Sequence, residues 1–209
     1  MVHFKLKNYS MSNSEVFLSP FPYPPLMLYI HSFFVKLYYL LGVDSLYIRN
    51  FFFKIPSLLS DILISFLLLK NYKDKEGSVL IFYICSPIII YAIFMHSQLD
   101  LIPTALFFWS IYLVLEGKLV FAALILGLGL STKFHIIAGL PLLCIYILKR
   151  SGLLKAILFA IIPILIYLFI SYPYLFSDGY IYLVMTNPKQ MQSYDVIYSV
   201  GHLKIILPI

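Results

Sequence analysis

The sequence predicts an all-α, polytopic transmembrane bundle of about six or seven helices. Of its 209 residues, 62% are hydrophobic and only 11% are charged, whereas soluble domains carry about 25% charged residues. The mean hydropathy is +0.94. The basic residues that give the net charge of +6 collect in short loops, which favours a membrane protein over a nucleic-acid partner. The apolar runs cover residues 51–69, 78–95, 101–115, 119–148 and 153–170.

Residues 1–48 are expected to form an outer-face segment. Within it, residues 24–41 are apolar enough to span, but a crossing there would invert every later loop. His31, Lys36 and many aromatic residues suit a helix that lies in the membrane interface. Pro24 and Pro25 favour extended backbone that leads directly into this helix.

Residues 49–171 are expected to form the transmembrane module, oriented by charge. The loop at 70–77 carries three lysines and is therefore assigned to the cytoplasm. Helix alternation then places residues 96–100 outside and 116–118 inside. The run 119–148 is interpreted as a hairpin of two short helices, because a single crossing would put the basic residues 149–155 outside. Asp61, in the middle of a helix, is expected to pair with a neighbouring helix.

The end of the chain completes this topology. Residues 172–201 contain one lysine and no arginine, and they are expected to form a second outer loop. Residues 202–209 are expected to begin a transmembrane helix that is cut short, so the chain is interpreted as a fragment or a truncated reading frame.

Polar residues gather on the outer face of this topology. His96, Gln98 and Asp100 lie between two apolar runs, where a bilayer tolerates polar groups only at its surface or in a water-filled cavity. Asp100 has two interpretations: a carboxylate favoured at a helix N-terminus by about 0.3–1 kcal/mol, or a polar residue of a site.

Lys133 and His135 interrupt the apolar run 119–148 on the same face. The lysine either extends to the headgroups or binds a lipid phosphate at the site, and the histidine is either an interface residue or part of the site. Tyr23, Tyr29 and His31 complete the candidate set. The histidines lack the spacing of metal ligands, so no metal site is predicted.

Several of these segments together resemble the GT-C superfamily of glycosyltransferases, in particular lipid-linked glucosyltransferases and the mannosyltransferases of GPI-anchor assembly. The resemblance spans residues 23 to 201, and each motif is short. The segments that carry it are 23–32 (YPPLMLYIHS), 49–61 (RNFFFKIPSLLSD), 87–100 with its HSQLD ending, 127–133 (GLGLSTK), 141–143 (PLL) and 172–174 (YPY).

The resemblance implies a GT-C type bundle and an enzyme that transfers a hexose, mannose or glucose, with inversion. The donor is a polyprenyl-phosphate-sugar and the acceptor a glycan or lipid at the extracytoplasmic face. Tyr23, Tyr29, His31, His96, Gln98, Asp100, Lys133 and His135 would bind substrate. The catalytic acidic residue of such enzymes lies upstream of the 23–26 segment, where the sequence offers only Glu15, outside any matching acidic motif. Glu15 is therefore named as the candidate, with the expectation that the true base lies further upstream and is missing from the chain.

The same resemblance places the chain in the plasma membrane of a prokaryote or the endoplasmic reticulum of a eukaryote. It implies no organic cofactor and leaves metal dependence open, because these enzymes differ in it. Two other functions remain: a non-catalytic membrane subunit of a glycosyltransferase, and a small-solute transporter, which would be expected to show an internal repeat and polar residues in the middle of the membrane.

Overall fold

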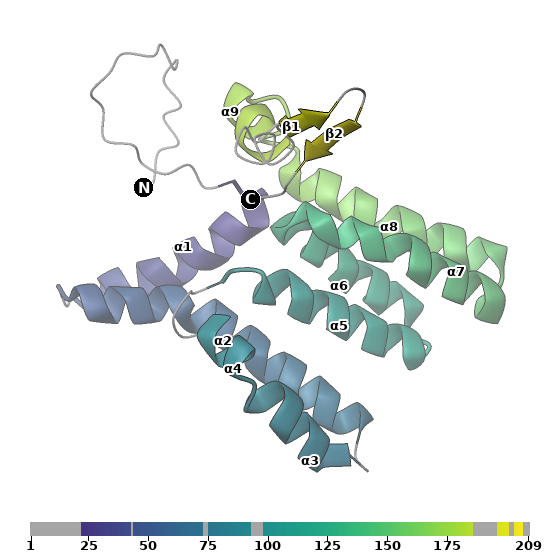
Figure 1. Ribbon diagram of the computed structural model, residues 1–209, viewed down its shortest axis with the longest axis horizontal. Helices are drawn as coiled ribbons and strands as arrows, with labels where there is room; N and C mark the ends of the chain where they lie inside the picture. Colours follow the sequence, from purple (N-terminus) through teal and green to yellow (C-terminus); the bar gives the residue numbers. More distant parts are fainter. Residues whose placement is uncertain are drawn as a thin grey trace. The chain divides into compact units, whose positions relative to one another are not determined.

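The computed structural model describes residues 22–42, 44–72, 75–92, 98–185, 196–200 and 203–206 (Figure 1). The chain forms two compact units, one of Pro24–Ser171 and one of Met1–Tyr23 with Tyr172–Ile209. The described residues of the larger unit are helical throughout, connected by short turns. This confirms the all-α prediction for that unit.

Three helical segments of the described chain are long and apolar enough to cross a membrane. They are Leu46–Asn71, Phe134–Ser151 and Leu153–Ser171. Two further apolar helices are shorter, Leu101–Leu115 and Leu119–Thr132. Large apolar side chains such as Phe82 and Phe169 are more than three quarters exposed. Such surfaces are unfavourable in water and suit contact with lipid, so the fold supports a multi-pass membrane protein.

Helices α1 (Pro25–Leu40) and α2 (Leu46–Asn71) form an antiparallel hairpin. Pro25 occupies the first turn of α1, as predicted, because its missing N–H needs no partner there. Gly42 turns the chain with φ of +66°, and the Ser45 N–H donates to the Tyr38 hydroxyl at 3.1 Å. Helix α1 also contacts the later helices α6 and α8. Its position in the membrane interface stays a prediction.

The apolar run 78–95, expected as one span, is broken. The helix α3 (Glu76–Val79) ends inside it, and the π-helix η2 (Leu80–Ile84) and α4 (Pro87–Ile90) follow. The break falls at Ser86, which adopts extended backbone, because the residue before a proline is disfavoured in the helical conformation. The apolar composition predicted burial in a membrane but not this interruption.

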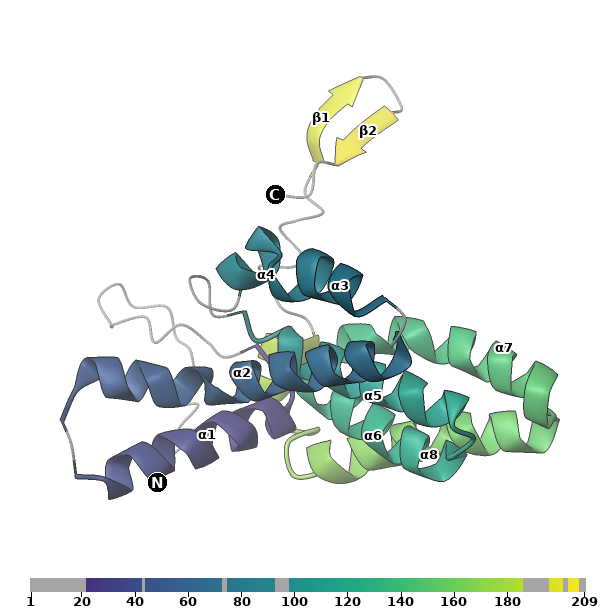
Figure 2. The same cartoon turned by 90° about the horizontal axis from the view of Figure 1, so that it is seen from below.

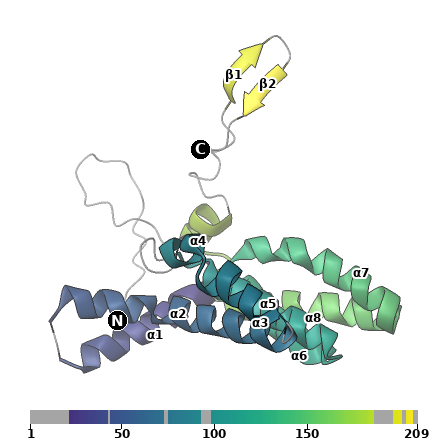
Figure 3. The same cartoon turned by 60° about the horizontal axis from the view of Figure 1, so that its bottom comes forward.

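The centre of the larger unit is an antiparallel bundle of α5 (Leu101–Leu115), α6 (Leu119–Thr132), α7 (Leu140–Ser151) and α8 (Leu153–Ser171), shown from below in Figure 2. The 3₁₀ helix η4 (Phe134–Gly139) connects α6 to α7, so the run 119–148 is two helices, as predicted. Gly117 and Gly152 have positive φ at the turns into α6 and α8. Figure 3 shows α7 and α8 side by side.

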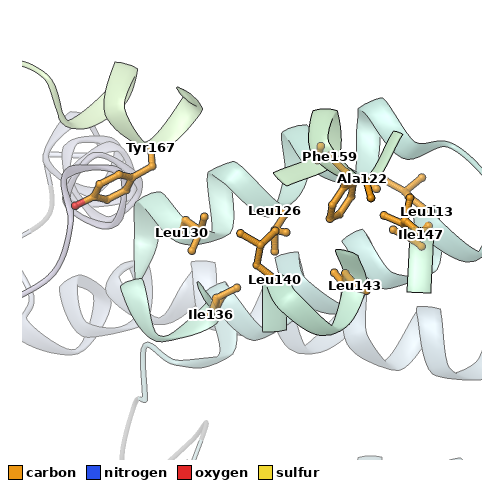
Figure 4. Close-up of a cluster of buried hydrophobic side chains, with 13 residues drawn as sticks. Leu113, Ala122, Leu126, Leu130, Ile136, Leu140, Leu143, Ile147, Phe159 and Tyr167 are labelled. Atoms are coloured by element: carbon orange, nitrogen blue, oxygen red, sulfur yellow. The ribbon is translucent and has the colours of Figure 1, made fainter. Parts of the chain in front are cut away.

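Aliphatic and aromatic side chains fill the interior of this bundle (Figure 4). Leu126 and Leu130 of α6, Ile147 of α7 and Phe159 of α8 are each no more than 2% exposed. Gly127 of α6 allows close approach of α8, since a Cβ built there would lie 3.0 Å from the Pro163 Cα. Small residues bring membrane helices together in the same way.

The smaller unit departs from the expected loop and helix. It contains α9 (Asp178–Tyr180), the π-helix η5 (Ile181–Met185) and two antiparallel strands, β1 (Val196–Val200) and β2 (Leu203–Ile206). Residues 203–206 therefore form a strand where the sequence suggested the start of a transmembrane helix. Their isoleucines and the valines of β1 have high strand propensity.

Candidate functional site

The break between α6 and η4 presents Lys133 at one end of the bundle. Thr132 is the last residue of α6, and Lys133 is extended, with φ of −157° and ψ of 128°. Two buried hydroxyls are satisfied within the helix: Ser131 Oγ donates to the Gly127 carbonyl at 2.8 Å, and Thr132 Oγ1 to the Gly129 carbonyl at 2.6 Å. The end of α6 therefore positions Lys133, and the hydroxyls of Ser131 and Thr132 before it are hydrogen-bonded within the helix.

Lys133 forms an ion pair with Asp100. Its Nζ contacts Oδ1 of Asp100, and the two side chains are 28% and 43% exposed. Asp100 immediately precedes α5, but its side chain makes no capping hydrogen bond. Asp100 is the N-cap residue of α5, where the helix dipole favours a carboxylate, and its ion pair with Lys133 is compatible with both interpretations of this residue. The Lys133 ammonium and the Asp100 carboxylate lie together at one end of an apolar bundle, and both side chains are partly exposed.

The backbone around Asp100 is fixed from two sides. The Asp100 carbonyl accepts from Thr104 Oγ1 at 2.6 Å. The Gln98 carbonyl accepts from Ser57 Oγ of α2 at 3.4 Å, while the Gln98 N–H donates to the Ala92 carbonyl at 3.0 Å. The Gln98 side chain itself is exposed. Helix α2 thereby holds the segment that positions the carboxylate.

The other predicted site residues lie in different settings. His135 is exposed on η4, two residues after Lys133, and Tyr29 is 45% exposed on α1. Tyr23 belongs to the smaller unit. His96 and Glu15 lie outside the described residues. Of the candidate set, the described contacts join Asp100 with Lys133.

His31 is covered by protein. It is 3% exposed, and its ring stacks on Phe53 of α2 with centroids 4.4 Å apart. A ligand could reach this imidazole only if α1 and α2 separated. The structure therefore gives His31 a packing contact between the helices, and the substrate contact expected from the sequence stays a prediction.

The buried position of His31 predicts a pH-dependent stability. Burial lowers its pKa to about 4, and a backbone interaction with Phe53 acts in the opposite direction. Below its unfolded pKa of about 6.5 the unfolded chain binds more protons, so this stabilisation is complete above that pH and is lost as the pH falls towards 4.

The test is the thermal unfolding midpoint of purified protein between about pH 7 and about pH 5. His31→Phe, which keeps a ring against Phe53, is expected to show a smaller decrease than the wild type. Equal decreases in the wild type and in His31→Phe would contradict the assignment.

A second carboxylate has a partner that the sequence did not reveal. The Tyr83 hydroxyl of η2 donates to Oδ1 of Asp61, in the middle of α2, at 3.0 Å. The expectation that Asp61 pairs with another helix is confirmed. Tyr83 could not be predicted as the partner of Asp61. It lies in an apolar run, and nothing in such a run indicates the π-helical turn that directs its side chain.

An apolar cleft of about 220 Å³ opens between α1, α2 and α5. It reaches α5 at Ile102, two residues after Asp100. Ser60 is the polar residue of its lining, and the Ser60 hydroxyl donates to the Pro56 carbonyl within α2. The full lining is Ile30, Phe34, Pro56, Leu59, Ser60, Leu63, Ile102, Ala105 and Leu106.

No protein-family model, curated protein or solved structure matches the chain. Among the described residues, no three His, Cys, Asp or Glu side chains gather in a way that would hold a metal ion.

Proposed function

We propose that the chain is the transmembrane module of a membrane glycosyltransferase. It would transfer a hexose, mannose or glucose, from a polyprenyl-phosphate-sugar to a glycan or lipid acceptor at the extracytoplasmic face, with inversion. The observation that carries the proposal is the Asp100–Lys133 ion pair at the end of an apolar bundle. The motif resemblance of residues 23–201 supplies the substrate class.

Lys133 is the proposed partner of the donor phosphate. The lipid phosphate leaves already ionised, so it needs a cation near the breaking bond and no acid. An ammonium at the end of a membrane bundle can meet a phosphate at the headgroup level. In the absence of donor, Asp100 balances this charge and holds the lysine in position.

The apolar cleft supports a lipid-linked donor. The cleft reaches α5 at Ile102, in the first turn of the helix that Asp100 caps, so an isoprenoid segment in it would lie towards the end of α5 that carries the ion pair. Ser60 is the polar side chain of the lining, so the cleft offers an apolar chain more contact than it offers a nucleotide-sugar.

The remaining roles follow from hydrogen-bonding chemistry. A carboxylate base takes the proton of the acceptor hydroxyl as it attacks the anomeric carbon, and Glu15 is the candidate for this base. His96, Gln98 and Asp100 would hold the sugar or the acceptor, with Tyr23, Tyr29 and His135 as further candidates for substrate contact.

The test is a transfer assay with the chain in proteoliposomes. Radiolabelled polyprenyl-phosphate-mannose and polyprenyl-phosphate-glucose are supplied with acceptor lipids from the source membranes. The proposal expects label in the acceptor and release of polyprenyl phosphate. Donor binding without transfer would favour the non-catalytic subunit, and the absence of both binding and transfer would overturn the proposal.

A further inference from the structure

Cations concentrate at the end of the bundle opposite Lys133. At this end α2 and α5 terminate, α6 begins, and the chain turns from α7 into α8 (Figures 1 and 2). Glu116 also lies here, at the end of α5. The cations of these termini are Lys70, Lys118, Lys149, Arg150 and Lys155.

Three of these cations, from three different elements, meet around the last turn of α5. Arg150 Nη1 of α7 donates to the Leu115 carbonyl at 3.4 Å and to the Tyr146 hydroxyl at 2.7 Å. Lys70 Nζ of α2 lies 4.8 Å from the Tyr112 ring centroid. Lys118 Nζ lies 3.9 Å from Oε2 of Glu116.

Membrane orientation explains the number of these cations but not their arrangement. Basic residues in cytoplasmic loops fix topology wherever they lie in the loop. Here Arg150 and Lys70 instead fold onto one turn of a neighbouring helix. Among the described contacts of this turn, Glu116 is the carboxylate, and it faces three cations.

Exposed apolar side chains surround the same turn. Leu115 is 48% exposed, Leu148 44%, Leu153 63% and Leu154 72%. A free anion would contact only the cations, whereas a phospholipid would also place its acyl chains against these leucines. The combination favours a lipid ligand.

We infer that this turn is a binding site for an anionic phospholipid. Lys70, Lys118 and Arg150 contact the headgroup, and the acyl chains lie along the exposed leucines of α7 and α8. The inference concerns the end of the bundle away from Lys133 and holds whether or not the chain transfers sugar.

The experiment compares lipids retained by the purified chain in native mass spectrometry. Mixed micelles supply equal amounts of phosphatidylglycerol and phosphatidylcholine. The wild type is expected to retain phosphatidylglycerol preferentially. The double variant Lys118→Gln/Arg150→Gln should reduce that preference on the order of tenfold.

Lys36→Gln/Arg49→Gln is the matched control. It removes one lysine and one arginine that are exposed on α1 and α2, so the total charge changes equally. It should leave the preference unchanged. An equal loss in both double variants would show that net charge alone attracts the lipid and would overturn the inference.

Two further measurements distinguish a lipid site from a site for a free anion and from a loss of folding. Displacement of phosphatidylglycerol by millimolar inorganic phosphate would identify a site for the free anion and contradict a lipid site. If Lys118→Gln/Arg150→Gln lowers the unfolding midpoint, the single variant Lys70→Gln, at an exposed cation of the proposed site, replaces it. That variant is expected to lose part of the preference, and an unchanged preference would overturn the inference.

Discussion

Replacing Lys133 with methionine is expected to reduce hexose transfer by about 10²- to 10³-fold, the usual effect of removing one group that stabilises developing charge in an enzyme. Methionine keeps the length and apolar stem of the side chain but removes the ammonium that would face the donor phosphate. The stability should change little, because the ion pair with Asp100 is partly exposed to solvent. The measurement is the initial rate with saturating polyprenyl-phosphate-hexose, together with the unfolding midpoint.

Two further variants separate a role in transfer from a role in folding. Lys133→Arg keeps a cation and should restore part of the rate. Asp100→Lys combined with Lys133→Asp keeps an ion pair but moves its cation to the start of α5, so it should preserve folding and lose transfer. Full activity in this exchanged protein, or in Lys133→Met, would remove Lys133 from the mechanism.

The sequence predicts which loops lie at the same end of the bundle, because successive helices run in opposite directions. The cations at 149–155 share a face with the lysine-rich loop at 70–77 only if the run 119–148 reverses at residues 131–135. The structure has α6 and α7 joined at this point through η4. Asp100 and Lys133, which lie 33 positions apart, therefore meet at one end.

The direct contact between these two residues could not be predicted. Helices α5 and α6 are apolar around their whole circumference, so no polar face tells which side turns towards a neighbour. The rotation of each helix about its axis is set by packing, for example by the approach of α8 to Gly127. The sequence therefore predicts that Asp100 and Lys133 lie at the same end of the bundle, but it does not predict that they form an ion pair.

Residue type alone could not predict how His31 packs. A histidine in an aromatic helix at a membrane surface suggests a ligand contact, yet its ring stacks on Phe53 and is covered. The partner lies 22 positions away on the next helix, and its contact depends on how the α1–α2 turn directs the two helices. Local sequence does not contain that information.

Gly127→Ala is expected to destabilise the bundle by about 1–3 kcal/mol, the usual cost of overpacking a tight interior. A Cβ at this position would lie 2.8 Å from the Ile166 Cβ and 3.0 Å from the Pro163 Cα. Neither atom is the end of a flexible side chain, so α6 and α8 must move apart to accept the methyl group. The packing lost along α8 would exceed the gain of about 1 kcal/mol that alanine brings to a helix over glycine.

Gly129 provides the matched control on the same helix, two residues further along. A Cβ there would lie 3.4 Å from Ile136 Cδ1 and from Leu106 Cβ, which is ordinary van der Waals contact. Gly129→Ala should therefore keep the helix-propensity gain and leave the unfolding midpoint unchanged or higher, while Gly127→Ala lowers it. Thermal unfolding of both variants in the same detergent measures the difference. If both substitutions raised the midpoint, the close approach of α6 and α8 at Gly127 would not be a constraint on the bundle, and packing at that point could not be what sets the rotation of α6.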